Sequence, residues 1–235
     1  MNVFIIGMNG GVGRLLSRQL QERGDSVHGL VRQREQQAEL EKEGLSTTVR
    51  DLSIMTVNEL AAAFDNMDAI VFSAGSNGGS RETTKAIDGD GLEKAMKATR
   101  MAGVDRFLSV SVLPESWRER ALGDDVEYYF AIKKSADVIL SRSDLDWVIL
   151  RPSLLTDEPG SGTVSLGPAE HHHQIAREDV ARTLAELTHE PRISRQILEL
   201  NAGSTPISAA VRANVRADAS RAKIPVSTTP TGISK

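Results

Sequence analysis

The sequence predicts an α/β fold: a doubly wound, mostly parallel sheet in a single domain, with a small C-terminal covering region. Two observations carry this prediction. Short apolar runs alternate with amphipathic stretches of helical period along most of the chain, and this alternation is typical of parallel sheets covered by helices through right-handed crossovers. The first apolar run also leads through Gly7, Gly10 and Gly13 directly into an amphipathic stretch.

Each apolar run is long enough for one buried strand, and each stretch between runs has the period of a helix. Strands are expected at residues 2–7, 26–32, 46–52, 68–75, 106–112, 146–152 and 196–201. Helices are expected at 12–23, 33–44, 56–65, in a long stretch ending at Gly103, and at 126–140 and 177–190. Gly24 and Gly103 are typical helix stops.

The alternation loosens after Pro152. Residues 152–174 are rich in Gly, Pro and Ser, and a long segment that follows a strand of a doubly wound sheet is placed to cover a ligand cleft. We therefore expect one domain over 1–215 with a cleft-covering segment at 152–174. The polar stretch 216–235, rich in Pro, Thr and Ser, is expected to be a C-terminal tail.

Composition excludes several classes of protein. The chain has 235 residues, a net charge of −4 and no cysteine, so disulfide frameworks and Cys-based metal sites are excluded. The acidic balance gives no reason to expect nucleic acid or an anionic membrane as a partner. No stretch approaches the roughly 20 apolar residues of a membrane span, and the first residues have no basic region typical of a secretion signal. A cytoplasmic location is expected by default.

The glycine stretch predicts a phosphate-binding turn. Glycine permits a tight strand-to-helix turn and close approach of a pyrophosphate, which the N–H groups and dipole of the helix N-terminus then attract. An NAD-selective site has an acid about 20 residues further on, but here the second strand ends at Val31-Arg32, with Arg34 close by. A guanidinium suits a 2′-phosphate, so NADP is favoured and NAD is the alternative. The alternative for the glycine stretch is a simple turn between two packed elements. The alternative for the two arginines is that they lie on a solvated face.

Several short motifs occur in an order that resembles a known family. They are "GMNGGVGR", "VR" after the second strand, "RDL", "FSAGS", "AGVDRFLSVS", "YFAIK", "ILRPSLLTDEPGSGTV" and "IAREDVA". Together, over about residues 1–210, they resemble the atypical short-chain dehydrogenases/reductases, which have a Rossmann fold. The similar branch binds NAD(P)H and includes proteins like biliverdin reductase B and regulators like the nitrogen-metabolite-repression protein.

The resemblance implies positions for the cofactor. The turn would hold its pyrophosphate, Arg32 would lie at the adenosine phosphate, and Asp51 and Leu52 would border the adenine. Pro152 and Ser153 would close over the nicotinamide end. The cofactor-binding residues implied are Gly7, Asn9, Gly10, Gly11, Val12, Gly13, Arg32, Asp51, Leu52, Ser73, Ala74, Gly75, Lys133, Pro152 and Ser153.

Tyr129 and Lys133 are spaced to share one face of the helix expected at 126–140. In short-chain reductases, the ammonium binds the nicotinamide ribose and lowers the tyrosine pKa, so the phenol transfers a proton while hydride moves. Ser111 would hydrogen-bond the carbonyl being reduced, although Val112 follows it where the family often has a second serine. The alternative to a role in proton transfer is that the adjacent Tyr128 and Tyr129 pack against other side chains.

Three classes of function remain open. The leading one is an NADP(H)-dependent oxidoreductase, an enzyme of the short-chain dehydrogenase/reductase type, that transfers hydride to a small carbonyl, quinone or flavin-like acceptor. The alternatives are an NADP(H)-binding redox sensor without turnover and a nucleotide-sugar epimerase or dehydratase. We expect a small-molecule substrate and a monomer or homodimer. Adjacent histidines point in different directions, so no metal site is predicted at His171–His173, and one of them is an alternative proton donor.

Overall fold

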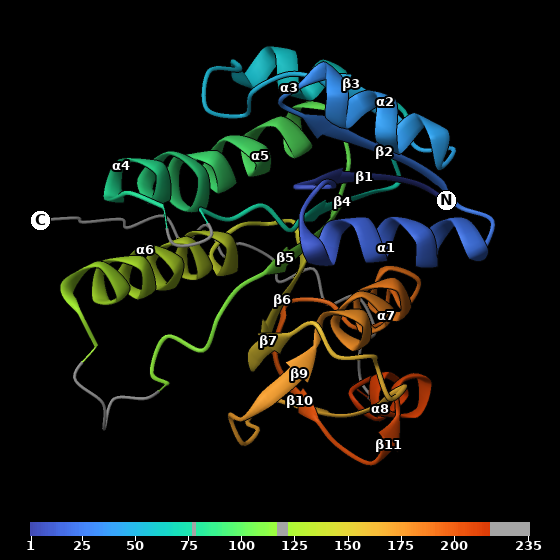
Figure 1. The fold of residues 1–235 in the computed structure, drawn as a ribbon, viewed down its shortest axis with the longest axis vertical. Helices are drawn as coiled ribbons and strands as arrows, with labels where there is room; N and C mark the ends of the chain where they lie inside the picture. Colours follow the sequence, from blue (N-terminus) through green and yellow to red (C-terminus); the bar gives the residue numbers. More distant parts are fainter. Residues whose placement is uncertain (77–78, 117–121, 217–235) are drawn as a thin grey trace, which may run out of the picture.

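The computed structural model describes residues 1–76, 79–116 and 122–216. It contains a large central sheet and a small second sheet (Figure 1). The strands are β1 (Asn2–Ile6), β2 (Ser26–Val31), β3 (Ser46–Val49), β4 (Ala69–Phe72), β5 (Arg106–Val110), β6 (Asp146–Pro152), β7 (Leu154–Thr156), β8 (Thr163–Gly167), β9 (Gln174–Ala176), β10 (Gln196–Ala202) and β11 (Thr205–Pro206).

The helices lie between these strands. They are α1 (Gly11–Glu22), α2 (Arg34–Lys42), α3 (Val57–Ala63), α4 (Arg81–Thr84), the π-helical turn η1 (Lys85–Gly89), α5 (Asp90–Met101), α6 (Asp124–Ser141), α7 (Arg177–Thr188) and α8 (Ile207–Ala213). No helix in the described part of the chain combines the length and apolar character that crossing a membrane requires.

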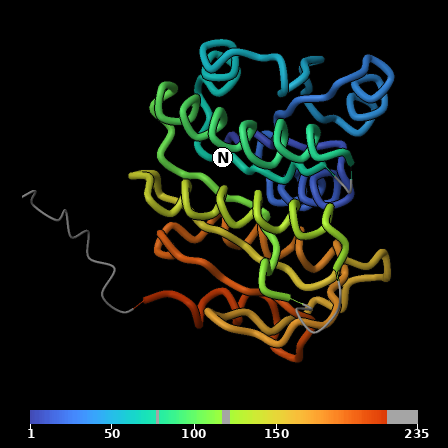
Figure 2. The backbone as a smooth tube through the Cα atoms, turned by 90° about the vertical axis from the view of Figure 1, so that its left-hand side faces the viewer, coloured from blue at the N-terminus to red at the C-terminus, as the bar shows by residue number. Residues whose placement is uncertain are grey.

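The central sheet has nine strands in the order β11-β8-β10-β6-β5-β4-β1-β2-β3. Its pairs are parallel from β10 through to β3, and only β8 pairs antiparallel, with β10 on one side and β11 on the other. The prediction of a doubly wound, mostly parallel sheet in one Rossmann-like domain is confirmed. Figures 1 and 2 show α2 and α3 at one end of the sheet and the C-terminal elements at the other.

The strands are buried on both faces because helices cover both. Val3 and Ile5 of β1 pack with α1 and α7, whereas Phe4 and Ile6 face the side covered by α3, α5 and α6. All four of these side chains are buried. A strand with two covered faces needs an unbroken apolar run, which explains why β1 and β4 were recognisable in the sequence.

The expected elements correspond to β1–β6, β10 and the larger helices. The long helix expected before Gly103 is an unbroken helical run in which the π-helical turn η1 lies between α4 and α5, and it ends at Met101. The sequence analysis missed three strands in or directly after the segment 152–174: β8 joins the central sheet, and β7 and β9 form the small sheet. The expected tail lies outside the described residues from 217 onward.

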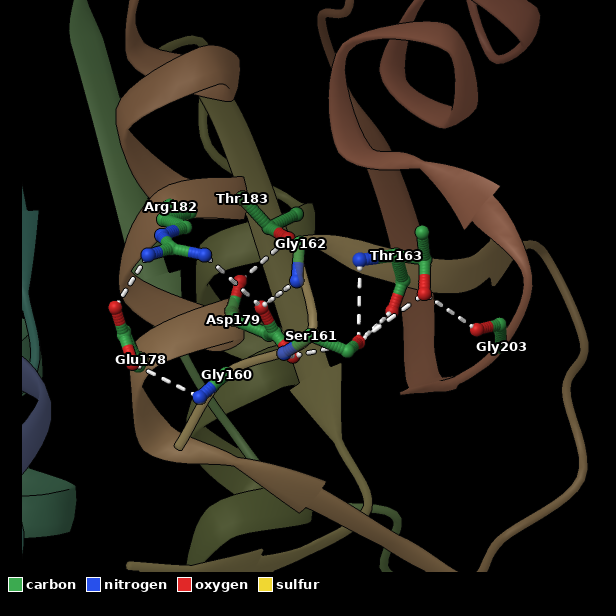
Figure 3. A network of polar contacts seen from close by, with 9 residues as sticks. All are labelled: Gly160, Ser161, Gly162, Thr163, Glu178, Asp179, Arg182, Thr183 and Gly203. Carbon is green, nitrogen blue, oxygen red and sulfur yellow. Dashed lines mark hydrogen bonds and ion pairs between the residues drawn. The ribbon is translucent and has the colours of Figure 1, made fainter. Parts of the chain in front are cut away.

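The loop before β8 is fastened to the start of α7. The buried carboxylate of Asp179 accepts hydrogen bonds from the backbone N–H groups of Ser161 and Gly162, both at 2.8 Å, and Glu178 accepts one from Gly160 at 2.8 Å. Figure 3 shows these acceptors on the first turn of α7, pointing into the loop. The motifs "EPGSGTV" and "REDVA" therefore form one structural unit.

Candidate functional site

The strand order reverses between β1 and β4, and the carboxyl ends of these strands open onto a cavity. Ligands bind in such crevices in doubly wound sheets. The cavity has a volume of about 650 Å³ and extends from Arg32, after β2, to Tyr129 and Lys133 on α6. A volume of this size suits a ligand of cofactor size.

The turn from β1 to α1 depends on glycine at two positions. Gly7 has a φ of 91°, and a Cβ there would lie 2.5 Å from the backbone nitrogen of Ala74. A Cβ on Gly13 would lie 2.2 Å from the Gly7 carbonyl oxygen, which accepts the N–H of Gly10 at 2.9 Å. Side chains at either position would separate the end of β1 from β4 or from α1.

The N-terminus of α1 faces the cavity without a side-chain cap. The N-cap residue is Gly10, which has no side chain that could accept a hydrogen bond from the first turn, and the first turn contains no acidic residue. By contrast, Thr56 caps α3 by accepting the N–H of Glu59. The first N–H groups of α1 and its positive dipole end are thus offered to a ligand, as a bound pyrophosphate requires.

One end of the cavity is basic. Arg32 follows β2 and Arg50 follows the neighbouring strand β3, and both line the cavity. The Arg50 N–H donates to the Val31 carbonyl at 2.8 Å, which keeps these two strand ends together. Hydrogen bonds from Ser53 and the Arg32 charge lower the pKa of Asp51 despite its partial burial. Arg34 does not line the cavity.

The other end combines Tyr129, Lys133 and Ser111 in one place. Tyr129 and Lys133 lie one turn apart on α6, and Ser111 directly follows β5. Lys133 is buried and its Nζ donates to the Val110 carbonyl at 3.0 Å. The Ser111 hydroxyl is also buried and forms no hydrogen bond of ordinary geometry with the residues that the structure describes.

A buried carboxylate forms an ion pair with Lys133. Asp88 is fully buried on the π-helical turn η1, and its Oδ1 lies 3.5 Å from the Lys133 Nζ. Its Oδ2 accepts the N–H of Ser76 at 2.8 Å. Turns of π-helix recur at functional sites because they re-aim a side chain, and this one connects the loop after β4 to the lysine of α6.

The expectation that Lys133 lowers the pKa of Tyr129 is wrong for this structure. Burial raises the pKa of Tyr129 well above its ordinary value, and the negative charges of Asp88 and Asp137 raise it further. Burial and the two carboxylates all disfavour the charged phenolate form. Tyr129 therefore remains protonated throughout the physiological pH range.

A second ion pair, between a buried carboxylate and a partly exposed arginine, continues the same face of α6. Asp137 Oδ2 accepts two hydrogen bonds from Arg151 of β6, at 2.8 and 2.9 Å. Burial raises the pKa of Asp137, and the neighbouring Ser111 hydroxyl and Arg151 oppose that rise. The arginine ties the middle of α6 to the sheet, so Tyr129 and Lys133 are fixed relative to β5 and β6.

His172 lines the cavity beside Pro152, whereas His171 and His173 are exposed. Burial lowers the pKa of His172, against the effect of its hydrogen bond with the Pro152 backbone. In the described residues, no group of three or more His, Cys, Asp or Glu side chains is arranged to hold a metal ion.

The structure brings together all of the predicted site residues except one. Gly13 lies beneath the turn rather than on the cavity wall. The residues that line the cavity are Gly7, Asn9, Gly10, Gly11, Val12, Arg32, Asp51, Leu52, Ser73, Ala74, Gly75, Ser111, Tyr129, Lys133, Pro152 and Ser153. The sequence analysis missed Arg50, Asp88 and Arg177. Arg50 lies inside the strand expected at 46–52, and only the observed end of β3 at Val49 gives it a position like that of Arg32.

Residues 7–191 match the model of a family described as NAD(P)H-binding. The chain belongs to this NAD(P)H-binding family. The resemblance to atypical short-chain dehydrogenases/reductases is thereby confirmed. The match begins at Gly7 and ends after α7, so it includes both the glycine turn and the helix that follows the small sheet.

Individual relatives of this NAD(P)H-binding protein carry different names. An uncharacterized sugar epimerase, YhfK, from Bacillus subtilis is 38% identical over 218 residues, covering 90% of this chain and 99% of its own length. The structure of a candidate NAD-dependent epimerase/dehydratase from Bacillus halodurans has a TM-score of 0.83 and 32% identity, covering 91% and 99% of the two chains. That of the oxidoreductase ylbE from Lactococcus lactis has a TM-score of 0.79 and 28% identity, covering 91% and 96%.

Gly7→Ala should destabilise the protein far more than Gly24→Ala. Both glycines have a positive φ, 91° and 87°, but a Cβ on Gly24 would meet nothing within 4 Å. Gly24→Ala should therefore cost only the backbone strain of about 1–2 kcal/mol, whereas Gly7→Ala adds a clash with the backbone of Ala74. Urea unfolding measures both free energies, and equal losses would contradict the close approach described for Gly7.

Proposed function

We propose that the protein is an NADP(H)-dependent oxidoreductase that transfers hydride to a small carbonyl, quinone or flavin-like acceptor. One observation carries the proposal: a single cavity joins a basic end at Arg32 and Arg50 to an end with Tyr129, Lys133 and Ser111. The glycine turn lies between these ends, at the place where a dinucleotide has its pyrophosphate.

The charges along the cavity favour NADP over NAD. Among the described residues, its lining includes the cations Arg32, Arg50, Lys133 and Arg177 but a single carboxylate, Asp51. The 2′-phosphate of NADP adds negative charge that a guanidinium binds in a bidentate manner. An adenosine 2′-phosphate beside Arg32 and Arg50 would therefore be stabilised by two neighbouring cations.

At the other end, the chain's own groups would bind and protonate the acceptor. The reduced nicotinamide supplies a hydride when it is bound. Lys133, held by Asp88 and the Val110 carbonyl, would donate to ribose hydroxyls, and the Ser111 hydroxyl would orient the acceptor oxygen. Tyr129 would donate its phenolic proton to that oxygen as the hydride reaches the neighbouring carbon, so one hydride and one proton complete the reduction.

The protonation state of Tyr129 favours reduction over the reverse reaction. A phenol with a raised pKa is a weaker acid, but it carries the proton that a reduction consumes, and little of it is present as the phenolate that would act as a base. Oxidation of an alcohol, which is also the first half of a sugar epimerisation through a nicotinamide, requires that base. The epimerase names of two relatives make epimerisation the second candidate function. The raised pKa of Tyr129 argues against this second function.

Arg32→Gln should weaken NADPH binding by about tenfold or more and leave NADH binding unchanged. The variant removes a charge-assisted contact to the 2′-phosphate, which NADH lacks. Arg34→Gln is the matched control, because Arg34 is exposed and does not line the cavity. Calorimetric titration measures the four affinities. Equal losses for NADPH and NADH, or tighter binding of NADH by the wild type, would contradict the proposed specificity.

Tyr129→Phe should lower the rate of NADPH oxidation by about a hundredfold or more, the contribution expected from a general acid, and preserve NADPH binding. Tyr128→Phe is the matched control, since Tyr128 lies under Arg81, with the guanidinium carbon 5.3 Å from the ring centroid, and does not line the cavity. Absorbance at the nicotinamide band follows turnover with carbonyl, quinone and flavin acceptors. Tight NADPH binding without turnover of any acceptor would reject the enzyme and favour the redox sensor.

A further inference from the structure

Gly11 is not explained by the turn that surrounds it. Its φ is not in the left-handed region, and a Cβ at this position would meet no backbone atom. The atoms it would meet belong to one side chain from the far end of the sequence: Arg177 Cδ at 2.8 Å and Nε at 3.2 Å. Glycine at position 11 therefore leaves room for the Arg177 side chain to cross the first turn of α1.

Arg177 is the first residue of α7, and it lines the cavity together with Gly10, Gly11 and Val12. Its Nη1 lies 2.6 Å from Asp157 Oδ1, and the Asp157 side chain is 90% exposed. An ion pair with so exposed a carboxylate contributes little to stability. The guanidinium thus has a weakly held partner on the solvent side and an uncapped helix N-terminus on the cavity side.

The backbone of Arg177 is fixed relative to α1. The two residues that follow, Glu178 and Asp179, hold the loop at 160–162 through three backbone N–H groups (Figure 3). Further along, Val180 and Leu184 of α7 are buried in the same core cluster as Leu16 of α1. A change of partner by Arg177 would therefore involve its side chain and not its backbone.

We infer that Arg177 binds the pyrophosphate of the dinucleotide together with the amides of α1, exchanging Asp157 for a phosphate oxygen. This inference rests on the proposed function. A phosphate at the α1 N-terminus would lie close to the Arg177 side chain, which crosses the first turn of that helix, and charge-assisted bonds from arginine to phosphate are stronger than an exposed ion pair. Asp157 is then a competitor of the phosphate for Arg177.

The two variants Arg177→Gln and Asp157→Asn test this exchange, because they should change affinity in opposite directions. Arg177→Gln should weaken NADPH and NADH by the same factor, about tenfold, since both dinucleotides carry the pyrophosphate. Asp157→Asn removes the competitor and should tighten both, by up to about fivefold. Arg177→Lys, which keeps the charge without the planar fork, should fall between wild type and Arg177→Gln.

Calorimetric titration with NADPH and NADH gives these affinities, and thermal unfolding checks that the variants remain folded. Arg177→Gln with wild-type affinity would overturn the inference while leaving the proposed function intact. Weakening by Asp157→Asn equal to that by Arg177→Gln would also overturn it, because the ion pair would then act through the fold. A wild-type protein that binds neither dinucleotide would end the proposed function, and this inference with it.

Discussion

The close approach of three backbone segments at the glycine turn is the constraint on which the site depends. The Gly7 carbonyl lies against Gly13 of α1, and Gly7 itself lies against Ala74 after β4. This contact sets the N-terminus of α1 at the point where the strand order reverses. Without it, the helix amides would not reach the crevice, and neither Arg32 nor Lys133 would belong to the same cavity as those amides.

Two ion pairs with buried carboxylates fix the positions of the residues at the opposite end of the cavity. Asp88 with Lys133 and Asp137 with Arg151 lie along one face of α6. Removing one partner of a buried pair leaves an uncompensated charge, at a cost of about 3–5 kcal/mol. The arrangement therefore tolerates little movement of Tyr129 relative to β5, as proton transfer to an acceptor in the cavity requires.

Local sequence patterns were sufficient for the central strands, the glycine turn and the pairing of Tyr129 with Lys133, because each depends on residues close in sequence. The apolar runs of β1 and β4 and the four-residue spacing on α6 are examples. Local patterns were insufficient where segments distant in sequence come into contact. The residues near Gly11 do not indicate its contact with Arg177, and the residues near Lys133 do not indicate its ion pair with Asp88. The pKa of Tyr129 was misjudged for the same reason, since burial and the Asp88 carboxylate raise it.

The short strand β8 was missed for a different reason. It lies in a segment rich in Gly, Pro and Ser, and its pairing with β10 is antiparallel, so it breaks the alternation that identified the other strands. The fastening of its preceding loop to Asp179 gives that segment a defined structure where its composition indicates only a loop. The motifs shared with the family in this part of the chain thus have a structural role beside the cavity.

A crystal structure of the protein grown with NADPH tests the central claim most directly. The account predicts pyrophosphate oxygens at hydrogen-bond distance, about 2.7–3.2 Å, from the amides at the start of α1, with the 2′-phosphate at Arg32 and Arg50 and the nicotinamide beside Tyr129. A dinucleotide bound in the reverse direction, or outside the crevice between the ends of β1 and β4, would contradict it.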